Sequence, residues 1–375
     1  MTKKAVVIGA GIVGLAMARA LAIRGFRVTV LERSGRAVGA SVRNFGMVWP
    51  IGQPTGKLLE RAMRTRSIWI SLCEQGKLWY DPCGSLLAVH EQDELDVIHE
   101  FTELNRAHRT CEVFDPERAI SKCPALCRDK LLGALWSDSE VIVDPRQVLA
   151  ALPIVLKELY DIQFYFGKCV SHVSHPRVFC GREVFEAEVI VVCSGYDFET
   201  LYPEAFASQP ITRCKLQMLR TVPQPDSWRM GTACSAGLTL THYAAFRDCA
   251  SLAKLQERYK VSHPEYLQYG IHVMASQQGN GEITLGDSHE YGLTFEPFDS
   301  DHINQLILNY LDLFLKFPTR RIAQTWHGIY AKMTNGASEL ILEPESGVLI
   351  VNGLGGAGMT LSFGLAEDVV EQYLK

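Results

Sequence analysis

The residues with the clearest chemical role form a glycine-rich turn near the N-terminus. Gly9, Gly11 and Gly14 follow an apolar segment at residues 5–8 and open a helical stretch. In such a turn the first two glycines allow close approach of a pyrophosphate, and the third lets the helix pack on the strand. The helix N-terminus then faces the phosphates, and Glu32 ends the next apolar segment, where it can accept hydrogen bonds from a ribose. Together these features predict a dinucleotide-binding protein.

Composition and charge limit the class of protein. The 375 residues are 47% hydrophobic and carry a net charge of −5, so the chain can bury a large core, and we expect two domains. The negative charge argues against nucleic acid and anionic membranes as partners. No segment approaches the roughly 20 uninterrupted apolar residues of a membrane span, and the apolar run after Lys3 and Lys4 is too short for a signal peptide. We therefore expect a soluble protein.

The cysteines indicate a reducing compartment. All eleven are scattered singly, and the nearest couple, Cys123 and Cys127, has no second pair at the spacing of a zinc site. We therefore expect free and mostly buried thiols, a cytoplasmic location and no metal centre.

Apolar periodicity and helix caps predict the other elements, including a buried strand at residues 187–195 and a second, more antiparallel sheet beyond it. Helices are expected at residues 57–76, 144–159, 246–259, 300–317 and 359–374. Strands are expected at residues 84–89, 164–166, 169–173, 177–180, 183–186, 187–195, 211–222, 271–286 and 347–352.

A second glycine-rich turn lies near the C-terminus. Residues 353–358 read Gly-Leu-Gly-Gly-Ala-Gly, between the strand at 347–352 and the last predicted helix. Glycine turns at both ends of the chain, on either side of a β-rich middle, are explained most simply by an extended flavin dinucleotide that is held at both ends.

The chain resembles the D-amino-acid oxidase superfamily of FAD enzymes, which includes glycine oxidase, sarcosine oxidase and sarcosine dehydrogenase. The matching segments are residues 7–14, 30–32, 39–46, 191–195, 325–329 and 352–359. The resemblance implies an α/β (α+β) fold, with a Rossmann-like FAD-binding domain of the glutathione-reductase type and an antiparallel-sheet substrate domain. It also implies oxidation of a C–N bond, in which hydride passes to the flavin N5 and the imine product hydrolyses. We expect the FAD-binding domain at residues 1–80, 140–210 and 320–375, and the substrate domain at 81–139 and 211–319.

By the resemblance, the glycines of the first turn hold the pyrophosphate of FAD and Glu32 holds the ribose. The second glycine turn brings backbone N–H groups and a helix dipole to the N1/C2=O edge of the flavin, where negative charge grows on reduction. The expected cofactor residues are Gly9, Gly11, Ile12, Val13, Gly14, Glu32, Arg33, Ser41, Arg43, Asn44, Val170, Ser194, Gly195, Gly355, Gly356, Gly358, Met359 and Thr360. We expect non-covalent FAD, because no Cys or His stands in a clear linkage position and Cys193 falls on the adenosine side.

The chain departs from the family pattern where the substrate is expected. Amino-acid oxidases of this family typically carry an Arg that clamps the substrate carboxylate, but Tyr330 stands at that position here. Lys332 lies two residues further along the same predicted strand face. Its point charge suits a more highly charged anion, and Arg43 or Lys215 could assist it.

Three histidines are further candidates, each with a structural alternative. His327 could place positive charge near the flavin or be a packed core histidine. His242 and Tyr243, which follow a predicted alternating strand, could line the substrate pocket or form a surface pair. His289 is a weaker candidate for the site, and a solvated lysine is the alternative for Lys332. We take His327, Tyr330, Lys332, His242 and Tyr243 as the candidate catalytic residues.

The substrate and the electron acceptor remain open at this point. Residues 42–50 and 240–243 resemble a branch of FAD oxidoreductases associated with bacterial phosphonate breakdown, which favours an N-methylated aminoalkylphosphonate such as N-methyl-2-aminoethylphosphonate. The alternatives are a glycine, sarcosine or D-amino-acid oxidase and a non-catalytic dinucleotide-binding protein. Monomeric sarcosine oxidases use a Lys for O₂ activation near the position of Thr284, so either O₂ or an electron carrier fits as the acceptor.

Overall fold

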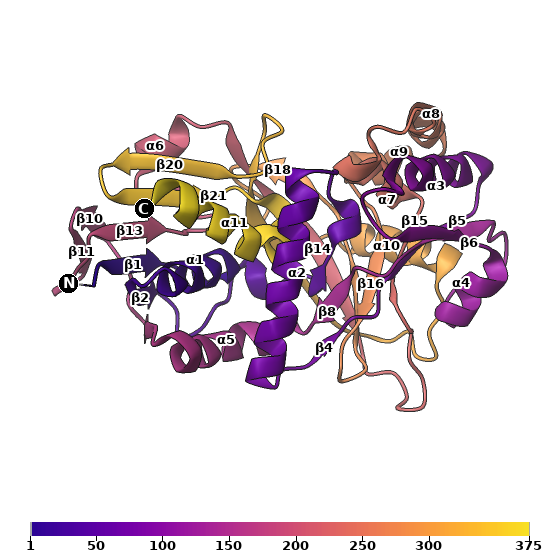
Figure 1. Ribbon diagram of the computed structural model, residues 1–375. Coiled ribbons are helices and arrows are strands. Elements are labelled where there is room, and N and C mark those ends of the chain that lie inside the picture. Colours follow the sequence, from indigo (N-terminus) through magenta and orange to yellow (C-terminus); the bar gives the residue numbers. More distant parts are fainter. Residues whose placement is uncertain (1, 375) are drawn as a thin grey trace.

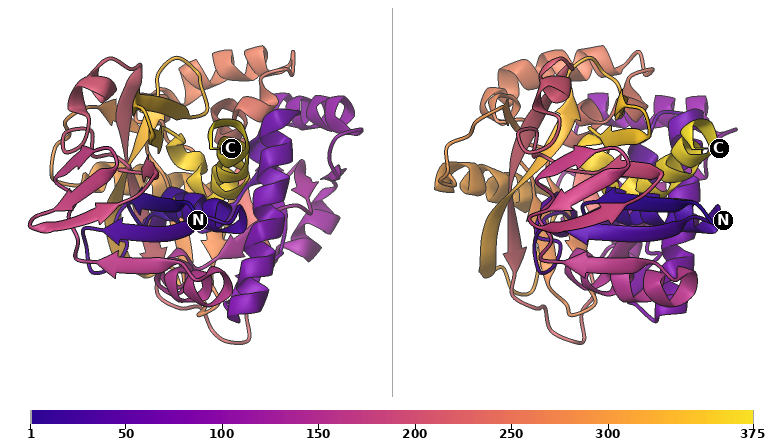
Figure 2. Two further views of the ribbon diagram at one scale, coloured as in Figure 1. Left: turned by 60° about the vertical axis from the view of Figure 1, so that its left-hand side comes forward. Right: turned by 90° about the vertical axis from the view of Figure 1, so that its left-hand side faces the viewer.

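The computed structural model describes residues 2–374, and its first unit is built on a six-stranded sheet (Figure 1). The strand order is β20-β21-β13-β1-β2-β9. The strands are β1 (Lys4–Ile8), β2 (Arg27–Glu32), β9 (Gln163–Phe166), β13 (Val189–Val192), β20 (Leu340–Glu345) and β21 (Val348–Asn352). Five are parallel, and the edge strand β20 is antiparallel. Segments from the start, middle and end of the chain therefore lie side by side, as Figure 2 also shows.

Alternate residues of the central strand β1 face two different cores. Ala5 and Val7 pack in one core, and Val6 and Ile8 pack in another. Because both faces are buried, the strand reads as a continuous apolar run. The helices that pack on the first core are α1 (Ile12–Ile23), α2 (Lys57–Gly76), α5 (Pro145–Tyr160) and α11 (Gly358–Tyr373). A small sheet contributes to the second core, with β10 (His172–Ser174), β11 (Arg177–Cys180) and β12 (Glu183–Glu186).

The second unit, on the right in Figure 1, is built on a nine-stranded sheet. Its order is β18-β14-β17-β16-β15-β5-β7-β6, and β19 pairs with β14 outside this path. The strands are β5 (Ser85–Val89), β6 (Cys111–Phe114), β7 (Gly133–Ser137), β14 (Ile211–Thr221), β15 (Ala233–Ala236), β16 (Met274–Gln277), β17 (Ile283–Gly286), β18 (Glu290–Gly292) and β19 (Ile322–Met333). Its pairings are antiparallel except the one between β5 and β15. The helices of this unit are α3 (Gln92–Asn105), α4 (Pro116–Lys122), α7 (Leu238–His242), α8 (Leu252–Ser262), α9 (Pro264–Gln268) and α10 (Asp301–Phe314).

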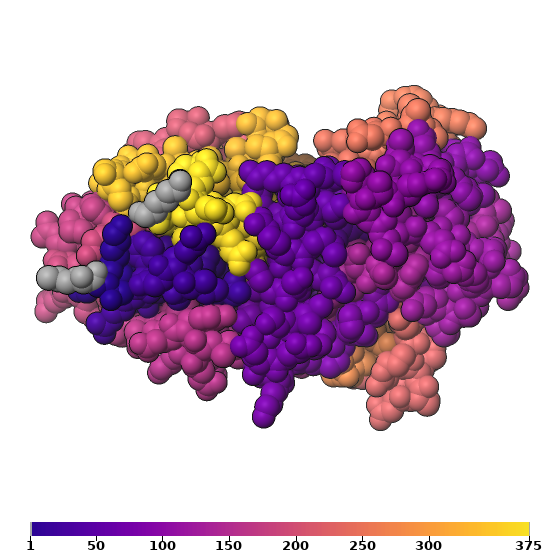
Figure 3. Space-filling view, in the orientation of Figure 1, coloured from indigo at the N-terminus to yellow at the C-terminus, as the bar shows by residue number. Residues whose placement is uncertain are grey.

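Short elements and helix α2 lie between these two units. In the space-filling view, α2 runs down the middle of this face, between the indigo and yellow residues of the first unit and the violet residues of the second (Figure 3). The short elements are β3 (Met47–Val48), β4 (Tyr80–Asp81), β8 (Val141–Val143) and the single turns η1 (Ala40–Val42), η2 (Pro50–Gly52), η3 (Ala244–Phe246) and η4 (Gly355–Ala357). Helix α6 (Pro203–Ala207) belongs to the first unit, where it lies near β20 in Figure 1.

The predicted α/β fold with a second, mostly antiparallel sheet is confirmed, and three local predictions are wrong. The segment before His242 is helix α7 rather than an alternating strand, and the Tyr310 hydroxyl accepts a hydrogen bond from its first N–H group, on Leu238. The helix expected from residue 246 starts at residue 252, because the Glu100 carboxylate binds the backbone just before it. Helix α10 ends at residue 314 rather than 317, since Leu315 turns to an extended conformation and pairs with Leu126.

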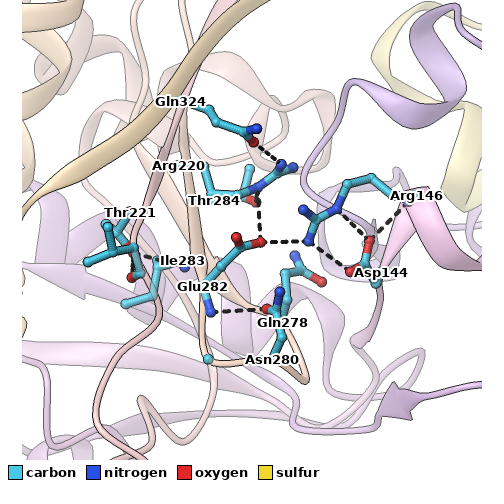
Figure 4. Close-up of polar contacts among 12 residues, drawn as sticks. Asp144, Arg146, Arg220, Thr221, Gln278, Asn280, Glu282, Ile283, Thr284 and Gln324 are labelled. Atoms are coloured by element: carbon cyan, nitrogen blue, oxygen red, sulfur yellow. Dashed lines mark hydrogen bonds and ion pairs between the residues drawn. The ribbon is translucent and has the colours of Figure 1, made fainter.

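A partly buried ion network joins the two units (Figure 4). Asp144 caps helix α5, as expected, by accepting from the Arg146 backbone N–H at 3.0 Å. The Arg146 guanidinium donates to Asp144 at 2.9 Å and to Glu282, beside β17, at 2.7 Å. Glu282 also lies 3.8 Å from Arg220 on β14, and Arg220 donates to Gln324 on β19 at 2.8 Å. One network of ion pairs and hydrogen bonds therefore connects helix α5 of the first unit to strands β14, β17 and β19 of the second.

Strand β19 touches both units. It pairs with β14 along nearly its whole length, and its Lys332 forms a bridge with Leu354 in the second glycine turn. We retain as a proposal the division into an FAD-binding domain (residues 1–80, 140–210 and 320–375) and a substrate domain (81–139 and 211–319), with β19 as the strand they share.

Two expectations from composition can be examined directly. Within residues 2–374, no helix combines the length and the apolar character needed to cross a membrane. All eleven cysteines are free thiols, and eight of them are buried.

Candidate active site

A cavity of about 570 Å³ begins at the two glycine turns and extends into the second unit. It lies at the carboxyl ends of β1, β13 and β21, which share one edge because these strands are parallel. The structure brings together all of the predicted site residues here except Gly14 and His327. Those in the lining are Gly9, Gly11, Ile12, Val13, Glu32, Arg33, Ser41, Arg43, Asn44, Val170, Ser194, Gly195, His242, Tyr243, Tyr330, Lys332, Gly355, Gly356, Gly358, Met359 and Thr360.

The first glycine turn is too tight for side chains. A Cβ atom on Gly9 would lie 2.4 Å from the Cys193 carbonyl oxygen, and the φ of +103° at Gly9 also favours glycine. A Cβ atom on Gly14 would lie 1.9 Å from the Gly9 carbonyl oxygen. Gly14 therefore acts by letting helix α1 pack against the turn, which explains its absence from the lining.

Glu32 lies in the cavity and supports the same turn. One carboxylate oxygen accepts from the Ala10 N–H and the other from the Ser34 N–H, each at 2.9 Å. A carboxylate has about four lone-pair sites, so acceptor capacity remains for a ribose. The carboxylate is thus held by two backbone bonds before any ligand binds.

The loop that follows β2, at residues 40–46, is fixed by its own side chains. Ser41 Oγ accepts from the Ile12 N–H at the start of α1, at 2.9 Å. The Asn44 amide donates to the carbonyls of Ala40 and Ser41 and accepts from Gly46. Asn44 therefore shapes the loop that lines the cavity.

The second glycine turn lies close to β19. A Cβ atom on Gly355 would come 3.6 Å from Lys332 Cγ, and one on Gly356 would come 3.5 Å from the Tyr330 hydroxyl. Helix α11 starts at Gly358, and Trp69 Nε1 holds its first turn by donating to the Met359 carbonyl at 2.9 Å. Backbone and a helix N-terminus, rather than side chains, therefore form this wall.

These features fit an extended dinucleotide. The cavity offers a glycine turn with a helix N-terminus, an oriented carboxylate and a second glycine turn with its own helix N-terminus. These are the groups that recognise a pyrophosphate, a ribose and an electron-rich ring edge.

Tyr330 and Lys332 enter the cavity from one side of β19. The Lys332 ammonium donates to the Tyr291 hydroxyl at 3.0 Å and lies 4.9 Å from the centre of that ring. Burial raises the pKa of Tyr330 well above its ordinary value, so its hydroxyl stays neutral. This wall therefore presents a cation and a neutral hydroxyl beside the second glycine turn.

Three histidines and one aspartate line the same end of the cavity, and we call His242, His272, His289 and Asp287 the histidine cluster. The rings of His242 and His272 stack with centroids 3.8 Å apart, and the His289 ring lies 4.6 Å from His242. The Asp287 carboxylate lies 3.4 Å from His272 Nε2 and 3.9 Å from His289 Nε2. His289 Nδ1 lies 2.9 Å from the Gly270 carbonyl and must donate to it.

Burial controls the charge of this cluster. It lowers the pKa of His242 and His272 well below the ordinary value and that of His289 to about 4. It raises the pKa of the Asp287 carboxyl well above its usual range. His272 Nδ1 and one Asp287 oxygen are buried without a hydrogen-bond partner among the described residues. The cluster is therefore close to neutral and keeps unused polar atoms.

Two residues considered for the substrate site lie elsewhere. His327 points away from the cavity and pairs with Asp299 at 2.8 Å, so it does not place charge in the lining. Lys215 is buried and donates to the carbonyls of Glu296 and Phe298. Arg43 does line the cavity, although one of its nitrogens donates to the His327 carbonyl.

Sequence reasoning missed His272, Asp287 and Arg247 as lining residues. Asp287 and His289 are two residues apart directly after β17. This spacing is the signal that could have placed both side chains on one face. His272 has no such signal, because it stands alone before β16.

Comparisons with known proteins agree with this geometry. A family model described as FAD dependent oxidoreductase matches residues 4–372. The bifunctional protein ThiO/ThiG of Trichormus variabilis is 28% identical over 243 residues, which are 60% of this chain and 35% of that protein. The tRNA 5-methylaminomethyl-2-thiouridine biosynthesis bifunctional protein MnmC of Saccharophagus degradans is 24% identical, over 73% of this chain and 40% of that protein. The chain thus spans well under half the length of these curated relatives.

Solved structures share the fold over nearly the whole chain. Glycine oxidase from Geobacillus kaustophilus has a TM-score of 0.76 at 18% identity and covers 100% of this chain and 96% of its own. L-proline dehydrogenase from P. horikoshii has a TM-score of 0.76 at 20% identity, with coverages of 99% and 93%. The family match spans both glycine turns and the cavity between them, and the chain therefore belongs to the DAO family of FAD dependent oxidoreductases.

Proposed function

We propose that the protein oxidises the C–N bond of a small anionic amine to an imine, which water then hydrolyses. The proposed substrate is a secondary, N-methylated aminoalkylphosphonate such as N-methyl-2-aminoethylphosphonate. The family supports the redox chemistry. The names of similar proteins support an amine substrate, since they include a glycine oxidase and a protein of methylaminomethyl-thiouridine biosynthesis.

The observation that carries the proposal is the polar wall of the cavity. Tyr330 stands where the family resemblance predicts an Arg, and Lys332 points into the same cavity. A guanidinium matches a planar carboxylate with two parallel hydrogen bonds, whereas an ammonium acts as a point charge. A tetrahedral, doubly charged group gains more from that point charge than a carboxylate does.

The chain's own groups would bind and orient the substrate between the two walls of the cavity. The hydride acceptor would be supplied by bound FAD, with the hydride leaving the carbon next to the amine nitrogen. Helix α11 starts in the lining at Gly358, so its positive end can stabilise negative charge on a bound ring. Lys332 and the Tyr330 hydroxyl would hold the anionic end of the substrate.

A glycine, sarcosine or D-amino-acid oxidase is the second candidate. The Tyr330 hydroxyl and the Lys332 ammonium share one wall and could hold a carboxylate together. The third reading, a dinucleotide-binding protein without chemistry, is set aside because the family is one of oxidoreductases.

The proposal includes O₂ or an electron carrier as the final acceptor and a cytoplasmic location. Near the expected lysine position, the Thr284 hydroxyl lies 3.5 Å from Arg220 Nε, and this contact does not select between the two acceptors. The eleven free thiols are consistent with a reducing compartment.

Anaerobic bleaching of the flavin tests the proposed function. The purified holoenzyme is mixed with a panel of primary and N-methylated amines that carry a phosphonate, a carboxylate or no anion. We expect N-methyl-2-aminoethylphosphonate to bleach the flavin with the highest rate per unit concentration. Faster bleaching by sarcosine or a D-amino acid would select the second candidate, and no bleaching by any amine would refute both.

A further inference from the structure

The histidine cluster is a group of buried titratable side chains that the proposed oxidation does not use. It lies in the same cavity wall as Lys332, yet no family motif led to His272 or Asp287. We propose that this cluster is an anion site that takes up a proton when a dianion binds beside Lys332. This inference rests on the proposed function, because it takes the substrate to be an anion. It adds which side chains hold the anion, and that a proton binds together with the anion.

The histidine cluster holds polar atoms that lack partners. His272 Nδ1 and Asp287 Oδ1 are buried without a hydrogen bond among the described residues, although Asp287 Oδ1 lies 3.4 Å from His272 Nε2. No hydrogen bond within residues 2–374 engages the His242 ring, which stacks on its neighbours. Their position in the lining indicates that a ligand supplies the missing partners.

The charged side chains around the histidine cluster are positive. Lys332 comes from β19, and Arg247, which lines the cavity just after η3, has no ion-pair partner within residues 2–374. Among the described residues that face the cluster, the acidic group is Asp287, and burial keeps it neutral. The other titratable neighbours that face the cluster are Tyr243, Tyr291, Tyr330 and Cys214. Two cations without a facing carboxylate make an anion the complementary ligand.

An anion beside the histidine cluster would favour the uptake of a proton. In the free protein, burial and the nearby positive charges keep the imidazoles neutral. A dianion bound next to the imidazoles would raise their pKa, because an opposite charge within about 4–6 Å favours the charged form. Asp287 faces both His272 and His289, so the added proton can be shared across the cluster.

A metal ion is the competing ligand for three histidines. Their ligand atoms lie within 4.8 Å of one another, but nitrogens around a tetrahedral ion at 2.0–2.1 Å are about 3.4 Å apart. The rings of His242 and His272 are stacked rather than arranged around a centre, and a second cation, Lys332, faces the same space. The geometry therefore favours the anion.

Sulfate binding to the holoenzyme tests the proposal, because sulfate is a tetrahedral dianion that keeps its charge between pH 6 and 9. Its Kd is measured by flavin absorbance across this range, and calorimetry in two buffers of different ionisation enthalpy counts the protons taken up. We expect uptake of about one proton and a Kd that rises by up to about tenfold per pH unit. A Kd independent of pH, with no proton uptake, would overturn the proposal.

Variants separate the cluster from a merely structural role. His242→Asn should reduce the proton uptake and flatten the pH dependence, whereas Lys332→Met should weaken sulfate at every pH and keep the slope. His302→Gln, on an exposed histidine paired with Glu265, is the matched control and should change neither. If His242→Asn does not fold, the wild-type proton count still decides. One equivalent of bound metal whose removal by chelator abolishes sulfate binding would overturn the proposal in favour of a metal centre.

The two proposals fail separately. Proton-coupled binding of sulfate and ethylphosphonate without oxidation of any aminophosphonate refutes the substrate and leaves the anion site standing. Oxidation of an aminophosphonate together with proton-free anion binding refutes the anion site and leaves the substrate standing.

Discussion

Replacing Lys332 by methionine removes the one lysine that faces the polar end of the cavity beside Tyr330 and Tyr291, among the described residues. At about 4 Å and an effective dielectric constant of 20, one pair of unit charges gains about 4 kcal/mol, and a dianion gains about twice that. Desolvation of the lysine and of the anion offsets most of this gain. We therefore expect a net loss of about 2 kcal/mol or more for a phosphonate, which lowers kcat/KM by roughly 30-fold or more.

The assay is anaerobic flavin reduction over a range of concentrations of the aminophosphonate and of the matching N-methylated carboxylate. The Lys332→Met variant should lose more activity toward the phosphonate than toward the carboxylate, because the lost Coulomb energy scales with ligand charge. Tyr330→Phe should cost less, about 1 kcal/mol, since it removes a neutral hydrogen bond. Lys260→Met, on an exposed lysine of α8, is the control for lost surface charge. Unchanged kcat/KM in Lys332→Met would place this ammonium in solvent and refute the reasoning.

Three further predictions concern the cofactor and the buried charges. Acid precipitation should release FAD into the supernatant, and yellow colour in the pellet would show a covalent link. Glu32→Ala should weaken FAD retention by about tenfold or more, measured by equilibrium dialysis, since charge-assisted hydrogen bonds contribute about 1.5–3 kcal/mol; equal retention would remove Glu32 from the ribose site. Lowering the pH from 7 to 4 should reduce the free energy of unfolding in urea by about 3 kcal/mol more in the wild type than in His289→Asn, because burial lowers the pKa of His289 to about 4 and the unfolded chain binds the proton first. The comparison cancels the opposite contribution of Asp287, whose raised pKa stabilises the folded chain as the pH falls. An equal loss in the two proteins would contradict a buried neutral His289.

The dinucleotide end of the site could be predicted from sequence because its signals are local. Gly9, Gly14 and Glu32 act within one strand, helix and strand, so spacing alone indicates their roles. The structure adds the reason for each glycine, namely the carbonyl oxygen that an added Cβ would meet.

The substrate end could be predicted only in part, because its residues come from separate elements. Tyr330 and Lys332 share one strand and could be placed together, but His272 reaches them only through the pairing of β16 with β17 and of β17 with β14. His327 shows an error that the strand period could have prevented. Residues 327 and 330 are three apart on β19, so their side chains point to opposite faces, and His327 pairs with Asp299 instead.

The strand order of the first sheet has a consequence for how the protein is made. Strand β1 pairs on one side with β2, which follows within the same unit, but on the other side with β13, whose outer neighbour β21 follows only near the end of the chain. A ribosome must therefore translate the whole second unit before the wall of the second glycine turn exists. The cavity can thus be complete only late in biosynthesis. Until β13 emerges, the growing chain displays an open parallel edge of β1, and this is where a chaperone or a neighbouring nascent chain can pair with it.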